Sequence, residues 1–371
     1  MSTLICYTGK YPHLGGVSTH LDILLHEAKK HSEIKILFSN RSRNTNSGGN
    51  SNHSIWLLLA SYMYRILVFG VKYFGYPGKF NKYVCHDYFS AFFLLMVGKR
   101  NVTIVIHGEL ANELVAISSI KKDSFFYNFF VRFEKVVYKK AALIICVDSR
   151  IQKYISGLNI NDRNISVKNF ISRDYLNKIL ENISQKLPPL PFQYIYCSRR
   201  LVPKNGVIVL LKAYKIYLES TPDPNIKLVI GGSGNELHSL KQFDEDNNLG
   251  VVFLGDIEYH ANMFYTANAG FNVVPSIAIG DYVEATAYSM LESMALKVPV
   301  LVSNIGGLGE VIINGENGFS FPQGDFKMAA SCIKTIINSP ADQLTKIVEA
   351  GFKTILNEHA AENILDKYYL K

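Results

Sequence analysis

The 371-residue sequence predicts an α/β protein with two domains of similar construction. In each half, short apolar runs alternate with helical patterns, which is typical of βα units around a parallel sheet. The proline-rich residues 184–192, SQKLPPLPF, separate the halves and are predicted to be a linker. Two such domains are expected to face each other across a cleft, because parallel sheets bind ligands beyond the carboxyl ends of their strands.

The predicted elements follow the chain in order. The first half has a helix over about residues 18–30 and the strands LICYTG, IKILFS, KYVCH, VTIVIHG and LIICVD. The second half has a helix over about residues 287–296 and the strands QYIYCS, IKLVIGG, VVFLGD, AGFNVVP and VPVLVSN.

Charge is divided unevenly between the halves. Residues 1–188 hold 25 Lys and Arg against 12 Asp and Glu, a net +13, whereas residues 189–371 hold 14 against 19, a net −5. The first half is therefore expected either to meet an anionic surface or simply to be a well-solvated basic domain. The five scattered cysteines and the absence of a secretory pattern in MSTLICYTGK favour a cytoplasmic location.

Residues 55–76 form the most hydrophobic segment. Its longest uncharged run, residues 54–64, has only 11 residues and is too short to span a bilayer. A helix lying in the membrane plane and a packed helix of the first domain are both compatible with the pattern.

Two glutamates stand in the apolar segment GDYVEATAYSMLESMALKVPVLVSNIGG. Glu284 is expected in a loop and Glu292 inside the following helix, where a buried carboxylate is costly unless it has partners. Both can face one pocket at the helix N-terminus. Ribose hydroxyls, sugar hydroxyls and phosphate, the three groups of a nucleotide-sugar, would satisfy Glu292, Glu284 and the loop amides.

Other candidate residues lie at predicted strand ends. Gly15 and Gly16 open a helix whose N–H groups suit phosphate, although a plain tight turn is an equal alternative. Arg199, Arg200 and Lys204 crowd a helix start, which is unfavourable unless an anion binds there. The remaining candidates at strand ends are His107 in VIHGE, for which a structural histidine is the alternative, and Gly232 in IGGSGNEL.

Together these motifs resemble the group 1, family 4 glycosyltransferases, which are retaining enzymes of the GT-B fold. Residues 284–320, from Glu284 through NGENGFS, are similar to the family pattern. That pattern is E-G-F-G-x-x-x-L-E-A-M-A-x-G-x-P-V, followed by G-G-x-x-E and N-G-x-x-G. YPHLGGVSTHL, HDYFSAF, VIHGE, RRLVPKNGV, IGGSGNEL and VFLGDI also match in order, so the resemblance covers nearly the whole chain.

The resemblance implies a GT-B protein with two Rossmann-like domains. It implies an acceptor-side domain over residues 1–185, a nucleotide-sugar-binding domain over 186–355, and a C-terminal helix over 356–371 that crosses back to the first domain. His107 and Glu284 are the implied catalytic residues. The implied donor-binding residues are Gly15, Gly16, Arg200, Lys204, Gly232, Ala285, Thr286, Ala287 and Glu292.

Three departures from the family pattern concern the donor. Ala285, Thr286 and Ala287 replace Gly-Phe-Gly, and the loop before Glu284 is longer than usual. The family sequence P-E-K-G is P-K-N-G here, which puts Asn205 at the position of the phosphate lysine. We expect Lys204 to bend round the turn to the phosphate, and replacement of Asn205 to have little effect.

The predicted activity is transfer of a hexose or N-acetylhexosamine from a nucleotide-sugar, UDP-linked by expectation, to a membrane-associated glycan or lipid-linked acceptor in cell-surface polysaccharide synthesis. No metal or other cofactor and no nucleic acid is expected, and the basic domain would attach peripherally to the inner face of the membrane. Alternatives are an epimerase or phosphorylase of the same fold, and a catalytically silent nucleotide-sugar-binding protein. Metal-dependent transfer through residues 244–246, DED, is a further alternative to a solvated helix end.

Overall fold

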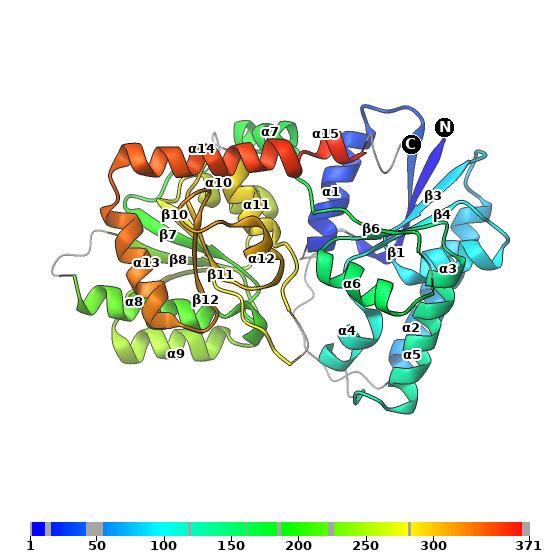
Figure 1. The fold of residues 1–371 in the computed structure, drawn as a ribbon, viewed down its shortest axis with the longest axis horizontal. Coiled ribbons are helices and arrows are strands. Elements are labelled where there is room, and N and C mark those ends of the chain that lie inside the picture. The colour runs from blue at the N-terminus through cyan, green and yellow to red at the C-terminus, as the bar shows by residue number, and fades with distance from the viewer. Residues whose placement is uncertain are drawn as a thin grey trace. The chain divides into compact units, whose positions relative to one another are not determined.

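The computed structural model describes residues 2–11, 16–41, 55–117, 120–160, 162–183, 187–221, 226–280 and 283–365. The chain forms two compact units, Met1–Asn169 with Ala361–Lys371, and Phe170–Ala360 (Figure 1). The predicted α/β class is correct, since each unit has one parallel six-stranded sheet with helices.

Unit 1 is built on the strand order β2-β1-β3-β4-β5-β6. Strands β3, β4 and β5 are almost completely buried, which explains why their sequences are mostly apolar rather than alternating, with Lys82 and Thr103 as the polar exceptions. The strands are β1 (Thr3–Tyr11), β2 (Ile34–Arg41), β3 (Lys82–Cys85), β4 (Val102–Ile106), β5 (Leu143–Cys146) and β6 (Asn164–Ser166). The helices are α1 (Gly16–Ala28), α2 (Ile55–Phe74), α3 (Tyr88–Met96), α4 (Leu110–Ile117), α5 (Phe125–Lys140), α6 (Ser149–Gly157) and α15 (Ala361–Ile364).

Unit 2 repeats the arrangement with the strand order β12-β11-β10-β7-β8-β9. The strands are β7 (Gln193–Ser198), β8 (Ile226–Gly231), β9 (Val252–Gly255), β10 (Phe271–Val274), β11 (Val300–Asn304) and β12 (Phe319–Pro322). The helices are α7 (Arg173–Ile183), the 3₁₀ turn η1 (Pro203–Asn205), α8 (Val207–Glu219), α9 (Leu237–Asn247), α10 (Tyr259–Ala267), α11 (Tyr288–Ala295), α12 (Gly306–Val311), α13 (Phe326–Asn338) and α14 (Ala341–Glu358).

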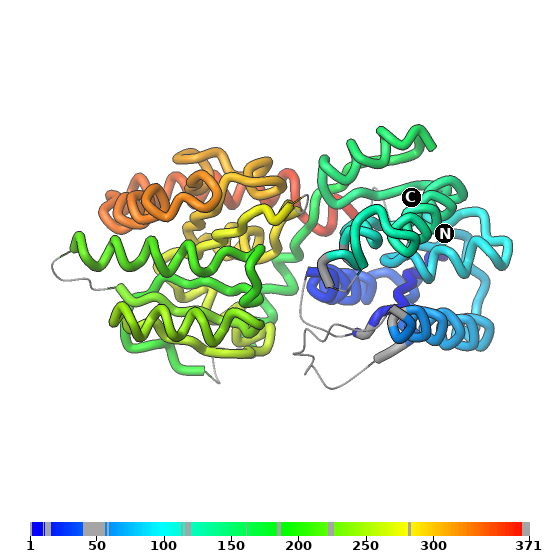
Figure 2. The backbone as a smooth tube through the Cα atoms, turned by 90° about the horizontal axis from the view of Figure 1, so that it is seen from below, coloured from blue at the N-terminus to red at the C-terminus, as the bar shows by residue number. Residues whose placement is uncertain are grey.

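Helices cover both faces of the unit 2 sheet. Ile195 and Cys197 of β7 join a core with α8, α9 and α13, whereas Tyr194 and Tyr196 point to the other face, toward Tyr265 of α10. The alternation follows from the two-residue period of a strand. Figures 1 and 2 show α8 and α9 side by side, as their contacts require.

The boundary between the units lies earlier than the predicted residue 185. Helix α7 packs against α10 and therefore belongs to unit 2, with the Tyr175 and Tyr259 ring centroids 6.2 Å apart. Near the C-terminus α14 extends to Glu358, and α15 groups with unit 1, where it contacts α1.

Helix α2 has one packed face and one exposed apolar face, and the membrane-plane alternative for residues 55–76 stays a prediction. One face is packed: Phe69 is fully buried, and the Tyr62 ring stacks on Phe89 of α3 at 4.4 Å. The other face leaves large apolar side chains exposed, among them Trp56 at 69% and Val71 at 76%. Among the described residues, no helix is long and apolar enough to cross a membrane.

Candidate functional site

The candidate site of unit 2 lies where the strand order reverses. Strands β8 and β9 extend the sheet on one side of β7, and the chain then returns to place β10 on the other side. The loops after β7 and β10 consequently diverge from neighbouring strand ends, which is where open parallel sheets bind ligands. Arg199, Ser276 and Glu284 follow these two strands.

An ion pair joins the two loops. Arg199 Nη2 donates to Glu284 Oε2 at 2.8 Å and to Ser276 Oγ at 3.0 Å, and Ser276 Oγ donates to the same carboxylate oxygen at 3.3 Å. The Arg199 and Glu284 side chains are only 11% and 14% exposed, so little water screens the pair. The sequence indicated Arg200 as the cation that meets the diphosphate and gave Glu284 sugar hydroxyls but no partner within the protein.

Asn205 stabilises the turn after β7. Its Oδ1 accepts from Arg199 Nη2 at 2.7 Å, and its Nδ2 donates to the Arg200 carbonyl oxygen at 2.7 Å. Because this amide is buried and bonded at both ends, its replacement is expected to destabilise the turn. The expectation that its replacement has little effect on the transfer rate stays a prediction. The Arg200 side chain is exposed and that of Lys204 is half-buried at the same turn.

Glycines allow these loops to touch through their backbones. Gly232 has φ +130°, and a Cβ there would lie 2.1 Å from the Arg199 carbonyl oxygen. A Cβ on Gly306 would lie 2.2 Å from the Glu284 carbonyl oxygen, and one on Gly307 2.4 Å from the Thr286 nitrogen. At these positions the glycines admit neighbouring protein backbone, and the donor-binding role of Gly232 stays a prediction.

Glu292 lies inside α11 and is 3% exposed. Tyr259 of α10 donates its hydroxyl to Glu292 Oε1 at 2.9 Å. Burial raises the pKa of Glu292 to about 7, against the opposing effect of the Tyr259 hydrogen bond. Tyr259 is thus a protein partner that the sequence did not reveal, and the carboxyl group can bind or release a proton near neutral pH.

The residues between the glutamates form the entry to α11. Ala285 is half-buried, Thr286 and Ala287 are buried, and Ala287 is the N-cap with extended backbone and no side-chain cap hydrogen bond. The positive end of the helix dipole therefore lies at these residues. In unit 1, Gly16 is the exposed first residue of α1, and Gly15 lies outside the described residues.

His107 follows β4 in unit 1 and has two histidine neighbours. Its Nε2 lies 3.2 Å from His86 Nδ1, and its ring centroid lies 4.8 Å from that of His20. Burial lowers the pKa of His107 to about 4, so its imidazole is neutral at pH 7. The sequence singled out His107 alone, because nothing in HDYFSAF or GGVSTHL places those histidines beside it.

Two of the acidic residues 244–246, Asp244 and Asp246, have ordinary structural roles in α9. Asp244 Oδ1 accepts from the Val251 backbone nitrogen at 3.0 Å, and Asp246 Oδ1 accepts from Gln242 at 2.8 Å. These contacts support the interpretation of a solvated helix end rather than a metal site.

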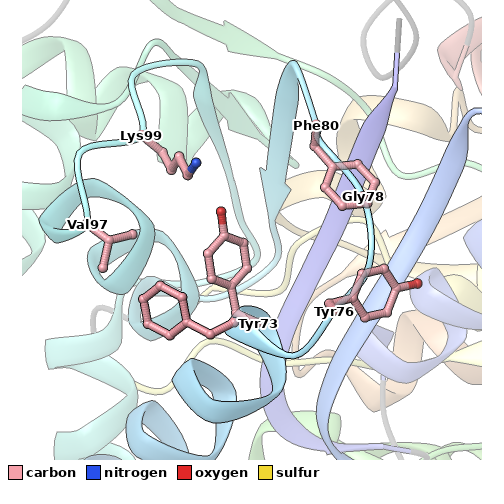
Figure 3. A pocket seen from close by; sticks show the side chains of 7 residues that line it. Tyr73, Tyr76, Gly78, Phe80, Val97 and Lys99 are labelled. Atoms are coloured by element: carbon pink, nitrogen blue, oxygen red, sulfur yellow. The ribbon is translucent and has the colours of Figure 1, made fainter.

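A separate pocket of about 270 Å³ lies in unit 1. Figure 3 shows Tyr73, Tyr76, Phe80 and Lys99 around it, and the Lys99 Nζ lies 5.9 Å from the Tyr73 ring centroid. Phe80 and Lys99 precede β3 and β4, so the pocket is at the amino-terminal edge of the sheet. It is therefore distinct from the strand-end positions that the sequence predicts for a donor or acceptor.

Comparison with known proteins agrees with the resemblance. Residues 179–354 match the family described as Glycosyl transferases group 1. The capsular polysaccharide biosynthesis glycosyltransferase CapM of Staphylococcus aureus is 27% identical over 263 residues, which are 65% of this chain and 64% of CapM. The chain thus spans somewhat less than two thirds of that relative.

Solved structures share the fold over nearly the whole chain. Sucrose-phosphate synthase of Thermosynechococcus elongatus has a TM-score of 0.75 at 18% identity, covering 100% of this chain and 98% of its own. Anabaena HepE in complex with UDP-glucose has a TM-score of 0.71 at 15% identity, with coverage of 99% and 98%. The predicted GT-B fold is confirmed.

Proposed function

Since residues 179–354 belong to the group 1 glycosyl transferases, we propose that this chain is a retaining glycosyltransferase of the family 4 type. It transfers a hexose or N-acetylhexosamine from a UDP-linked donor to a membrane-associated glycan or lipid-linked acceptor in cell-surface polysaccharide synthesis. The similarity to CapM, a capsular polysaccharide enzyme, and the fold shared with a UDP-glucose complex support this proposal.

The observation that carries the proposal is the pair of carboxylates at the α11 entry. Glu292 has one bond to Tyr259 and a pKa of about 7, so its ionised form can accept hydrogen bonds from the two ribose hydroxyls. Glu284 accepts hydrogen bonds from the hydroxyls of the transferred sugar while Arg199 holds its Oε2. Gly232 and residues 285–287 line the donor site as backbone.

The proposed reaction is a front-face displacement. The acceptor oxygen forms a bond to the anomeric carbon on the face from which the diphosphate leaves. The departing phosphate oxygen takes the acceptor proton, so the products are the glycoside and the free nucleoside diphosphate. Arg200, Lys204 and the backbone amides at Gly15 and Gly16 stabilise the diphosphate charge, and His107 contacts the sugar ring. No metal is required for this charge balance.

The basic unit 1 attaches peripherally to anionic lipid at the inner face of the membrane. Exposed apolar side chains on α2, including Trp56, Leu57 and Tyr64, would enter the interface. The exposed cations of α5, Arg132, Lys135, Lys139 and Lys140, would attract anionic headgroups.

A panel of nucleotide-sugars tests the activity. We expect one UDP-sugar to give free UDP, with faster release when a membrane extract supplies acceptor. An epimerase would change the sugar without releasing nucleotide, a phosphorylase would need inorganic phosphate, and a silent binding protein would bind UDP yet release none from any donor. Each of these three outcomes would contradict the proposal.

A further inference from the structure

Three histidines from separate segments converge in unit 1. His20 belongs to α1, His86 directly follows β3, and His107 directly follows β4. Strands β1, β3 and β4 are successive neighbours in the sheet, so the two strand-end histidines share its carboxyl edge. His20 and His86 are buried, and the proposed transfer reaction uses neither of them.

Their ring nitrogens are close enough to share an ion. One nitrogen from each ring lies within 4.8 Å of the others, and His86 Nδ1 lies 3.2 Å from His107 Nε2. Zinc–imidazole bonds of about 2.0–2.1 Å at a tetrahedral angle put ligand nitrogens roughly 3.4 Å apart. The His86–His107 separation of 3.2 Å is close to this distance, and the His20 nitrogen, within 4.8 Å of the others, would have to approach by up to about 1.4 Å.

The surroundings also suit a metal. Burial lowers the pKa of all three histidines, so at neutral pH each ring is neutral and has a lone pair on one of its two nitrogens. The Asn169 side chain is hydrogen-bonded to His20. A polar side chain bonded to a histidine ligand orients the ring and tunes the metal.

We propose that His20, His86 and His107 form a binding site for a late transition metal, with Zn²⁺ as the expected ion. Three imidazoles leave a fourth position open for water or another small ligand, as in catalytic zinc sites. The alternative is a cluster joined only by a hydrogen bond between His86 and His107. On metal binding that hydrogen bond would be lost, and the donating ring would change tautomer.

His107 is also the proposed contact of the sugar ring, so metal binding is measured without any sugar donor, and its outcome is then distinguishable from failure of the proposed transfer. Untagged full-length protein, cleared of metal with EDTA and dialysed, would be titrated with ZnCl₂ by calorimetry. We expect one Zn²⁺ per chain. His86→Gln and His107→Gln should each weaken binding by at least about 100-fold, beyond the upper range for second-shell changes. His238→Gln removes an exposed histidine of α9 and should change nothing.

Cobalt gives a second measurement on the unaltered chain, which keeps the test valid if a histidine variant fails to fold. Co²⁺ should produce the intense visible absorption of a four-coordinate ion, and Zn²⁺ should remove it. Weak octahedral absorption, no stoichiometric Zn²⁺ binding, or folded His86→Gln binding as tightly as the unaltered chain would each overturn the proposal.

Discussion

The affinity of the protein for UDP should depend on the ionisation of Glu292. Hydrogen bonds from ribose hydroxyls to an ionised carboxylate are worth about 1.5–3 kcal/mol, compared with about 0.5–1.5 kcal/mol for neutral partners. Burial raises the pKa of Glu292 to about 7, so the protein without nucleotide holds both forms at neutral pH. UDP should bind the ionised form preferentially.

The size of the effect follows from this pKa. About one tenth of Glu292 is ionised at pH 6 and about nine tenths at pH 8, and apparent affinity scales with the competent fraction. UDP should therefore bind about tenfold more weakly at pH 6 than at pH 8, a difference of about 1.4 kcal/mol. Glu292→Gln keeps the shape without the charge, and should bind weakly at both pH values.

Calorimetric titration with UDP between pH 5.5 and 8.5 would measure this. The UDP phosphate also titrates in this range, but its titration affects the unaltered chain and Glu292→Gln equally. The difference between their UDP affinities at each pH therefore reports the ionisation of Glu292 alone. Tyr259→Phe removes the hydroxyl that holds this pKa down, and should move the midpoint to higher pH. Parallel curves for the unaltered chain and Glu292→Gln would refute the assignment of Glu292 to the ribose.

The free energy of unfolding of the nucleotide-free protein should fall as pH rises, whereas the affinity for UDP should increase. The folded-state pKa of Glu292 is raised from 4.5 to about 7, so its stabilising contribution is fully present below the unfolded-state value. That contribution is lost as pH rises through about 7, amounting to at most about 3 kcal/mol. The free energy of unfolding of Glu292→Gln, measured by urea denaturation, should therefore increase relative to that of the unaltered chain as pH rises from 4.5 to 8. If the difference between the two free energies is the same at every pH, the raised pKa is contradicted.

Three further predictions concern the diphosphate and the membrane. Transfer should survive EDTA, because protein cations and helix dipoles offset the diphosphate charge, and activity lost to EDTA and regained with Mn²⁺ would contradict this. Lys204→Ala should lower the transfer rate at least about tenfold, which is about 1.4 kcal/mol of barrier, and leave the melting temperature unchanged. Asn205→Ala should lower the free energy of unfolding by about 1–3 kcal/mol. If Asn205→Ala instead stays fully stable and loses only activity, then Asn205 rather than Lys204 binds the phosphate. Trp56, the single tryptophan, should shift its fluorescence to the blue on anionic vesicles and less so at high salt, whereas equal shifts on neutral vesicles would exclude electrostatic docking.

Local patterns predicted the local structure well. The helix expected over residues 287–296 is α11, Tyr288–Ala295, and the helix expected over residues 18–30 is α1, Gly16–Ala28. The burial of Glu292 could also be predicted, because Leu291 and Met294 flank it on a helix that must face the core. These features depend on periodicity within a few turns, which a single sequence displays directly.

Pairings between distant residues could not be predicted in the same way. Arg199 and Glu284 are 85 positions apart, and choosing Arg199 over Arg200 requires knowing which way each side chain leaves the end of β7. The earlier domain boundary has the same origin, because the packing of α7 on α10 depends on a contact between remote segments. Hydrophobic periodicity carries no information about either pairing.

Strand order explains why both clusters of candidate residues form where they do. In each unit the chain builds outward from its first strand, then returns to add a strand on the other side: β3 beside β1, and β10 beside β7. Thr8 and Asp87 are bonded across the first reversal, and Arg199 and Glu284 across the second. The local sequences around these pairs are unrelated, yet the same topology brings each pair together. Predicting the partners of a strand-end residue therefore requires the order of the strands, which is set by contacts along the whole sheet.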